Sequence, residues 1–135
     1  MNCQLYTGIV VEALGRRILE VPRSRELWLD EEHTAFVPAG EPLATGDIAF
    51  LTDNPDKDPR LFHVGVVLVA EDGINWLTHN ATHHGTAVIE RLDDAVAHPS
   101  YGTIAGIKRP VGENPNGADR AFLEEHGLSD LIQSA

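Results

Sequence analysis

The stretch Leu61–Val69, with the sequence LFHVGVVLV, decides the fold class of this chain. Apart from His63 it is apolar on both faces, which is typical of a strand buried near the middle of a sheet. Short β-type runs separated by turn residues lie around it, and this spacing indicates a mostly antiparallel sheet. The strands expected are Asp47–Thr52, Leu61–Val69, Ile74–Asn80, Thr86–Arg91 and Ile104–Lys108.

Helical patterns precede these strands. Apolar residues recur at helical spacing across Cys3–Leu14, and Gly15 is typical of the residue just past a helix end. A second short helix is expected at Arg23–Glu32, entered through Pro22. The stretch Thr34–Thr45 has the proline and glycine content of a loop.

The end of the chain is expected to be helical again. Val111–Gly117 has the composition of a linker, and Ala118–Gln133 predicts a C-terminal helix interrupted near Gly127. The predicted fold class is therefore α+β, with an N-terminal helix that carries Cys3 packed on five or six mostly antiparallel strands. We expect residues 1–110 to form the main body, and residues 111–135 to be the linker and C-terminal helix of the same single domain.

Composition and charge exclude several classes of protein. The chain has 135 residues, with 10 Lys plus Arg against 21 Asp plus Glu, so its formal net charge of −11 repels nucleic-acid phosphates and anionic lipid. No apolar run approaches the length of a membrane span, and the first residues lack the basic start of a secretory signal. We therefore expect a soluble, cytoplasmic protein without a membrane span or a nucleic-acid partner. A processed or phage-type enzyme is the alternative.

Cys3 is the single cysteine, which excludes an internal disulfide and a multi-cysteine metal site. At the start of a helix its thiol would face unsatisfied N–H groups and the positive end of the helix dipole, and both favour the thiolate. A nucleophile is one interpretation of Cys3. A small buried hydrophobe without a chemical role is the other.

Two histidines fall on neighbouring expected strands. His63, in a central apolar strand, needs a partner for its ring nitrogens, and either a thiolate or a backbone carbonyl would supply one. His79 falls on the next strand, and antiparallel neighbours lie side by side, so His79 is expected to contact His63 and fix its tautomer. Each residue alone is compatible with a structural role. The ordered set of Cys3, His63 and His79 predicts a catalytic triad.

A metal site built from His79, His83 and His84 is the rival interpretation. His83 and His84 precede Gly85 in an expected turn, where their side chains should diverge, and no HExxH or CxxC pattern accompanies them. We therefore expect no bound metal and no other cofactor. The remaining histidines are expected to be solvated surface residues: His33, His98 and His126.

Several segments follow one another in the order of a known set of motifs. Gly46–Phe50 (GDIAF) is similar to a Gly-Asp-Leu-Val-Phe strand, and His63–Val66 (HVGV) to a His-Val-Gly-Ile strand. Asn2–Leu5 (NCQL) stands where an Asp-Cys-Ser-Gly helix start would be. Weaker similarities are found at Pro22–Ser24, Thr78–Asn80 and Gly106–Pro110. Together, over residues 2–110, the chain resembles the NlpC/P60 family of papain-like cysteine peptidases, which cleave bacterial cell-wall peptides.

The resemblance implies a papain-like fold and assigns roles to residues. Cys3 would be the nucleophile, His63 the general base and His79 the residue that orients His63, with acyl transfer through a thioester. The substrate-binding residues would be Asn2, Arg23, Ser24 and Tyr101. The oxyanion would be held by the backbone N–H of Cys3 and a second donor, with Tyr6 and Tyr101 as candidates.

The chain also departs from the family pattern. Asn2 replaces an aspartate that helps to bind the free amine of the substrate in members that cleave peptidoglycan, which puts a preference for L-alanyl-D-glutamyl peptides in doubt. We expect a cysteine hydrolase that cleaves a peptide amide, either in a cell-wall peptide or at a related γ-glutamyl bond. The alternative is a non-catalytic module that binds a peptide or partner on the same fold.

Overall fold

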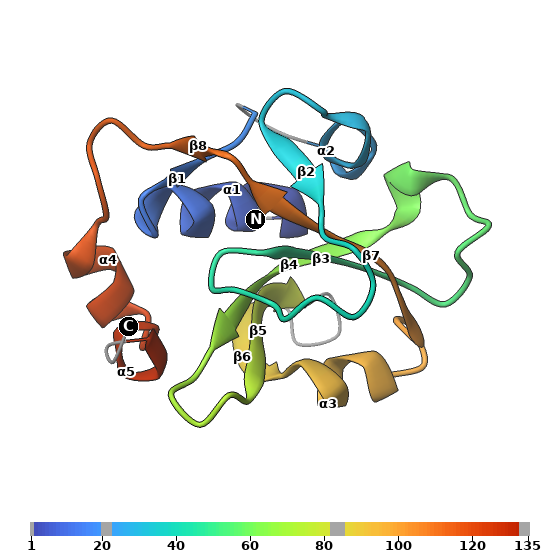
Figure 1. Ribbon diagram of the computed structural model, residues 1–135. Coiled ribbons are helices and arrows are strands. Elements are labelled where there is room, and N and C mark those ends of the chain that lie inside the picture. The colour runs from blue at the N-terminus through green and yellow to red at the C-terminus, as the bar shows by residue number, and fades with distance from the viewer. Residues whose placement is uncertain (1, 20–22, 82–85, 133–135) are drawn as a thin grey trace.

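A six-stranded antiparallel sheet forms the centre of the computed structural model, which describes residues 2–19, 23–81 and 86–132. The strand order is β2-β7-β3-β4-β5-β6, so β3 and β4 are the two central strands (Figure 1). The α+β class and the predicted sheet are confirmed. The strands are β2 (Thr34–Phe36), β3 (Ile48–Thr52), β4 (His63–Val69), β5 (Asn75–Ala81), β6 (Thr86–Arg91) and β7 (Thr103–Pro110).

Short elements complete the described chain. The two-residue strands β1 (Arg16–Arg17) and β8 (Gly112–Glu113) pair with each other outside the main sheet. The helices are α1 (Cys3–Ala13), α2 (Ser24–Leu29), the 3-10 turn η1 (Pro59–Leu61), α3 (Leu92–Ala97), α4 (Arg120–Glu125) and α5 (Ser129–Ile132). No helix within these described ranges is long and apolar enough to cross a bilayer.

Some expected boundaries are wrong, and for β2 and β8 the reason is a pairing partner distant in sequence. Thr34–Phe36 was expected to be loop, yet it forms the edge strand β2 because it finds β7 as an antiparallel neighbour. The second helix ends at Leu29, because Asp30 is already extended. The linker holds β8, and the segment after Arg91 holds α3.

Local signals explain α1 well. The side chain of Asn2 accepts a hydrogen bond from the N–H of Leu5 at 2.7 Å and so caps the helix start. Gly15 adopts a φ of +85°, which lets the chain leave the helix end in the left-handed region. The predicted interruption of the C-terminal helix is confirmed in the same way, because Gly127 has a φ of +72° between α4 and α5.

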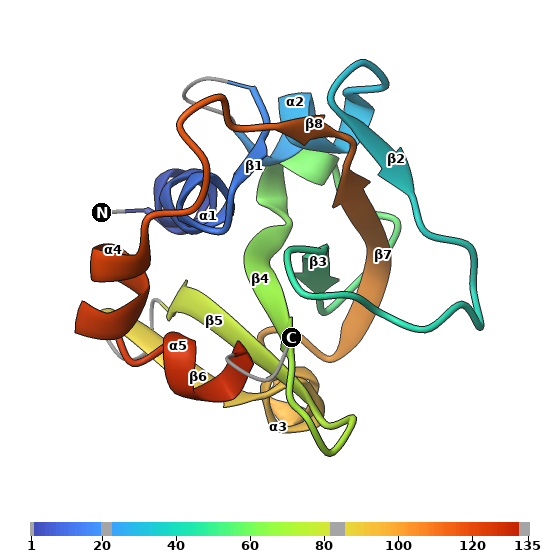
Figure 2. The same ribbon diagram turned by 60° about the vertical axis from the view of Figure 1, so that its left-hand side comes forward.

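The sheet is covered on both faces. In both views α1 and α3 lie on opposite sides of the strands (Figures 1 and 2). On the α1 side, Val10 and Val11 pack with alternate residues of β4 such as Val64 and Val66. On the α3 side, Val67 of β4 packs with Ala95 of α3. β4 is therefore apolar on both faces, as its sequence predicts.

Candidate functional site

A chain of hydrogen bonds crosses three neighbouring strands on the α3 face. His63 begins β4, His79 lies on β5 and Glu90 lies on β6. Nε2 of His63 is 2.7 Å from Nδ1 of His79, and Nε2 of His79 is 2.7 Å from Oε2 of Glu90. The ring of His79 is fully buried, whereas the Glu90 side chain is one-quarter exposed. The predicted contact between His63 and His79 is confirmed, and Glu90 extends it.

The carboxylate fixes the direction of these bonds. Because an ionised carboxylate only accepts, Nε2 of His79 must donate its proton to Glu90. In its neutral form His79 then accepts at Nδ1 from Nε2–H of His63. This arrangement leaves the lone pair of His63 on Nδ1. A proton taken up there would place a positive charge that Glu90 stabilises through His79.

Glu90 was not among the residues expected at the site, although the sequence carries a signal for it. β5 and β6 form an antiparallel pair in which His79 lies opposite Val88. Side chains alternate along a strand, so Glu90, two residues further, shares the face of Val88 and His79. An acidic residue that lies on the same face of the sheet as a buried histidine of the neighbouring predicted strand indicates a hydrogen-bond partner for that histidine.

Tyr101 packs directly on the imidazole of His63. The two rings are stacked, with centroids 4.4 Å apart and planes 16° from parallel, and Tyr101 is buried. His98 lies on the same tyrosine, with ring centroids 5.3 Å apart, so it is more than the solvated residue expected. Tyr101 was expected to bind substrate; here it contacts the candidate base and limits rotation of the ring.

Gly65 leaves the space that His79 occupies. A Cβ built on Gly65 would lie 2.9 Å from Cβ of His79 and 2.8 Å from Cδ1 of Leu77, both closer than such atoms approach. Only glycine fits at this point without displacing the neighbouring strand's side chains. The glycine of the His-Val-Gly sequence is therefore explained by packing within this molecule, because it makes room for Leu77 and His79.

The thiol of Cys3 reaches the backbone beside His63. Val67 exchanges backbone hydrogen bonds with Gly46 and Asp47 on the β3 side, so the two-residue alternation turns the N–H of Val64 toward β5. Pairing of β4 with β5 starts only at Val66, which leaves that N–H outside the ladder. This N–H faces the Cys3 sulfur and acts to lower the pKa of the thiol. The sulfur of the candidate nucleophile therefore faces the backbone of the residue that follows the candidate base.

The protonation state expected for Cys3 needs correction. Burial raises the pKa of the Cys3 thiol, and the backbone N–H groups of Val64, Cys3 and Gln4 only partly oppose this effect. The helix start favours the thiolate, as predicted, but desolvation outweighs it. At neutral pH the side chain is therefore a thiol, and a base is needed to activate it.

A buried serine joins the two halves of the site. Gln4, next to Cys3, donates from Nε2 to Oγ of Ser24 at 2.8 Å. Ser24 in turn donates to the carbonyl oxygen of Phe62, next to His63, at 2.7 Å. Ser24 is fully buried, so in this structure it positions the two chain segments and does not offer its hydroxyl to a substrate, contrary to expectation.

The other expected site residues fall in different places. Asn2 and Arg23 are exposed and line one pocket beside α1. Tyr6 is buried and its hydroxyl is hydrogen-bonded to Thr78 at 2.7 Å, which removes it as an oxyanion donor.

Of the three histidines in the rival metal site, the structure describes His79. His83 and His84 lie outside the described residues, and both ring nitrogens of His79 are engaged by His63 and Glu90. Within the described ranges, no group of three or more His, Cys, Asp or Glu is arranged to hold a metal ion.

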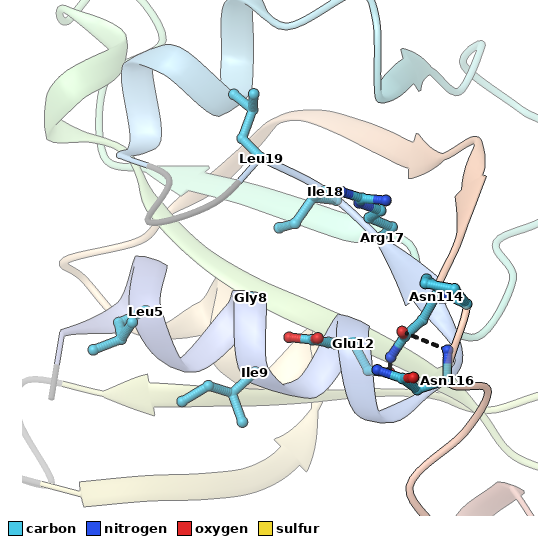
Figure 3. Close-up of a pocket in the computed structure, with 10 residues that line it drawn as sticks. Leu5, Gly8, Ile9, Glu12, Arg17, Ile18, Leu19, Asn114 and Asn116 are labelled. Carbon is cyan, nitrogen blue, oxygen red and sulfur yellow. Dashed lines mark hydrogen bonds between the residues drawn. The ribbon is translucent and has the colours of Figure 1, made fainter.

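A separate pocket lies along the outer side of α1, between that helix, residues 17–19 and the linker (Figure 3). Its volume is about 420 Å³, and Leu5, Ile9 and Ile18 supply an apolar lining. Asn114 closes one end, where its side-chain amide donates to the carbonyl oxygen of Glu12 at 3.1 Å. It contains neither the thiol nor a histidine, so the candidate chemistry lies elsewhere.

The chain was compared with family models, curated proteins and solved structures, and no match was found in any of the three. The geometry of His63, His79 and Glu90, with Cys3 beside the backbone of Val64, is what points to a function.

Proposed function

We propose that this protein is a cysteine hydrolase that cleaves peptide amides, built as a papain-like domain of the NlpC/P60 type. The observation that carries the proposal is the directed chain from Glu90 through His79 to His63, with the sulfur of Cys3 facing the N–H of Val64, the residue after His63. An acid, two imidazoles and a thiol in this order are the parts that nucleophilic acyl transfer requires.

The first step begins with a neutral thiol. As the sulfur attacks the amide carbonyl carbon, Nδ1 of His63 takes the thiol proton, so no preformed thiolate is needed. The imidazolium that results is stabilised by Glu90 through His79. The C=O π electrons move to oxygen, and the backbone N–H groups of Cys3 and Gln4, which face the sulfur, are the candidate donors to that oxyanion.

The second half returns the enzyme to its starting state. His63 gives its proton to the amide nitrogen, the C–N bond breaks and the amine leaves, with the acyl group held on Cys3 as a thioester. Water then adds to the thioester as His63 accepts its proton. Expulsion of the sulfur releases the carboxylic acid, and the proton returns to the thiol.

The substrate class follows from the resemblance and from the chemistry together. A cell-wall peptide or a related γ-glutamyl amide fits the motif order around Cys3 and His63. A peptide-binding module without catalysis is the second candidate, and the observation that favours it is the burial that raises the pKa of Cys3.

Hydrolysis of muropeptides by wild type, Cys3→Ala and Cys3→Ser tests the proposal. We expect wild type to release the peptide products and both variants to lose at least about 10³-fold in kcat/KM, because the nucleophile is removed. Circular dichroism and thermal unfolding control for folding. Trapping of a mass adduct on Cys3 would identify the thioester. Full activity in Cys3→Ala, or peptide binding by wild type without turnover, would contradict the hydrolase function.

A further inference from the structure

Three arginines gather in one pocket next to the candidate nucleophile. The pocket has a volume of about 590 Å³ and is separate from the apolar pocket of Figure 3, although Leu5 borders both. Its lining residues are Asn2, Gln4, Leu5, Arg23, Arg25, Glu26 and Arg60.

The fold brings these cations to Cys3 from two other segments. Asn2 and Gln4, the chain neighbours of Cys3, line the pocket, although the Cys3 side chain itself is not part of the lining. The bond from Gln4 to Ser24 holds the start of α2, with Arg23 and Arg25, against the start of α1. η1, which carries Arg60, packs on α2.

The positive charge in this pocket is largely uncompensated. Among the residues that the structure describes, no carboxylate forms an ion pair with Arg23 or Arg25. Arg60 approaches Asp58 only at 3.9 Å, and Glu26 is the one acidic residue in the lining.

Charge elsewhere on the molecule makes this concentration unusual. The chain has a net charge of −11 and only 10 Lys plus Arg. Arg109, in contrast, is bound by Asp47 at 2.7 Å and Glu41 at 3.1 Å. The molecule as a whole is acidic and repels anions. The three guanidinium groups around this cavity create a local positive potential that attracts them.

We propose that this arginine pocket binds the carboxylate groups of an acidic peptide, and that the substrates carry such groups near the scissile amide. The inference rests on the proposed hydrolase function for the position of that amide. Guanidinium groups match carboxylates because their N–H donors form two parallel bonds with the two oxygens. Carboxylates bound there would lie beside Cys3 and would bring the neighbouring carbonyl carbon to the sulfur.

Binding can be measured without catalysis. We would titrate Cys3→Ala with acetyl-(Glu)₃-amide and with its neutral counterpart acetyl-(Gln)₃-amide, following the arginine Nε–H signals by NMR. The glutamate peptide is expected to bind at least tenfold more tightly. The double variant Arg25→Gln/Arg60→Gln should lose that preference, whereas Arg120→Gln, an exposed arginine on α4, should keep it. Both substituted arginines are exposed, and a thermal unfolding curve checks that the fold is retained.

Alkylation links the pocket to the thiol. Iodoacetate and iodoacetamide transfer similar groups to sulfur and release iodide, but only iodoacetate carries a carboxylate. The ratio of their rates at Cys3 should fall several-fold in Arg25→Gln/Arg60→Gln and stay unchanged in Arg120→Gln.

The outcomes separate this inference from the proposed function. Equal binding of the two peptides by Cys3→Ala, or a preference for the glutamate peptide that survives Arg25→Gln/Arg60→Gln, overturns the pocket assignment. Tighter binding of inorganic phosphate than of the glutamate peptide overturns the choice of an acidic peptide. Arginine-dependent binding of the glutamate peptide, with no reaction of Cys3 toward either reagent, supports the pocket and refutes the hydrolase.

Discussion

Two buried polar networks among the described residues, one around Lys108 and one around His63 and His79, differ in the chemistry they allow. Around β7, the Lys108 ammonium donates to the carbonyl oxygens of Leu27, Trp28 and Asp30, so each of its three protons has a fixed acceptor. The histidine network instead runs in one direction and ends at His63, and the N–H of the next residue, Val64, faces the thiol of Cys3.

This difference separates a structural network from a chemical one. Burial lowers the pKa of Lys108, while the charges of Asp30 and Glu31 oppose that effect, and its bonds close the C-terminal end of α2. Imidazoles change charge near neutral pH, so the network of His63 and His79 can accept a proton and return it. Substitutions in the first network should change stability, and substitutions in the second should change activity.

The largest effect on stability is expected for Lys108→Met. The substitution leaves three carbonyl oxygens without their donor in a buried setting and should lower the free energy of unfolding by about 2–4 kcal/mol. Urea unfolding measures this change. Activity per folded molecule should stay close to that of wild type. A stable variant that has lost activity would break the distinction between the two networks.

Glu90→Gln is expected to show the reverse pattern. Removing the carboxylate charge withdraws stabilisation from the imidazolium, so kcat/KM should fall by about 10–100-fold with little change in stability. Because the protonated form of His63 loses support, the acidic limb of the pH profile should move to lower pH. Glu124→Gln, at an exposed position on α4, is the matched control. An unmoved limb would show that Glu90 does not act on His63.

Ser24→Ala is expected to have the smallest effect. It removes the bridge between Gln4 and the carbonyl of Phe62, which should cost about 1–2 kcal/mol of stability and about tenfold in kcat. KM should change less, because Ser24 is buried away from substrate. Ser24→Thr keeps the hydroxyl and should restore kcat. If the alanine and threonine variants behave alike, Ser24 does not position the site.

Much of the architecture could be predicted because its signals are local. The apolar run of β4, the turn residues between strands and the glycine after α1 each depend on a few neighbours in sequence. The contact of His63 with His79 followed from strand adjacency alone. β2 was missed because its extended state depends on β7, far away in the chain.

The chemical properties of the site were harder to predict. Glu90 is one of 21 acidic residues, and only its register beside His79 distinguishes it. The raised pKa of Cys3 comes from burial, a tertiary property that opposes the local effect of the helix start. Ser24 resembled a substrate contact in sequence, and its burial gives it a structural position instead.

The coupling of Cys3 to His63 is tested most directly by the pH dependence of iodoacetamide alkylation in wild type and His63→Ala. Cys3 is the single thiol, so every adduct reports on it. In His63→Ala the rate should follow one titration above the ordinary thiol pKa of 9.0, because burial raises that pKa. Wild type should react at least tenfold faster near pH 7, where neutral His63 takes the proton, and should converge with the variant at high pH. Superimposed profiles would contradict a Cys3–His63 couple and with it the proposed function.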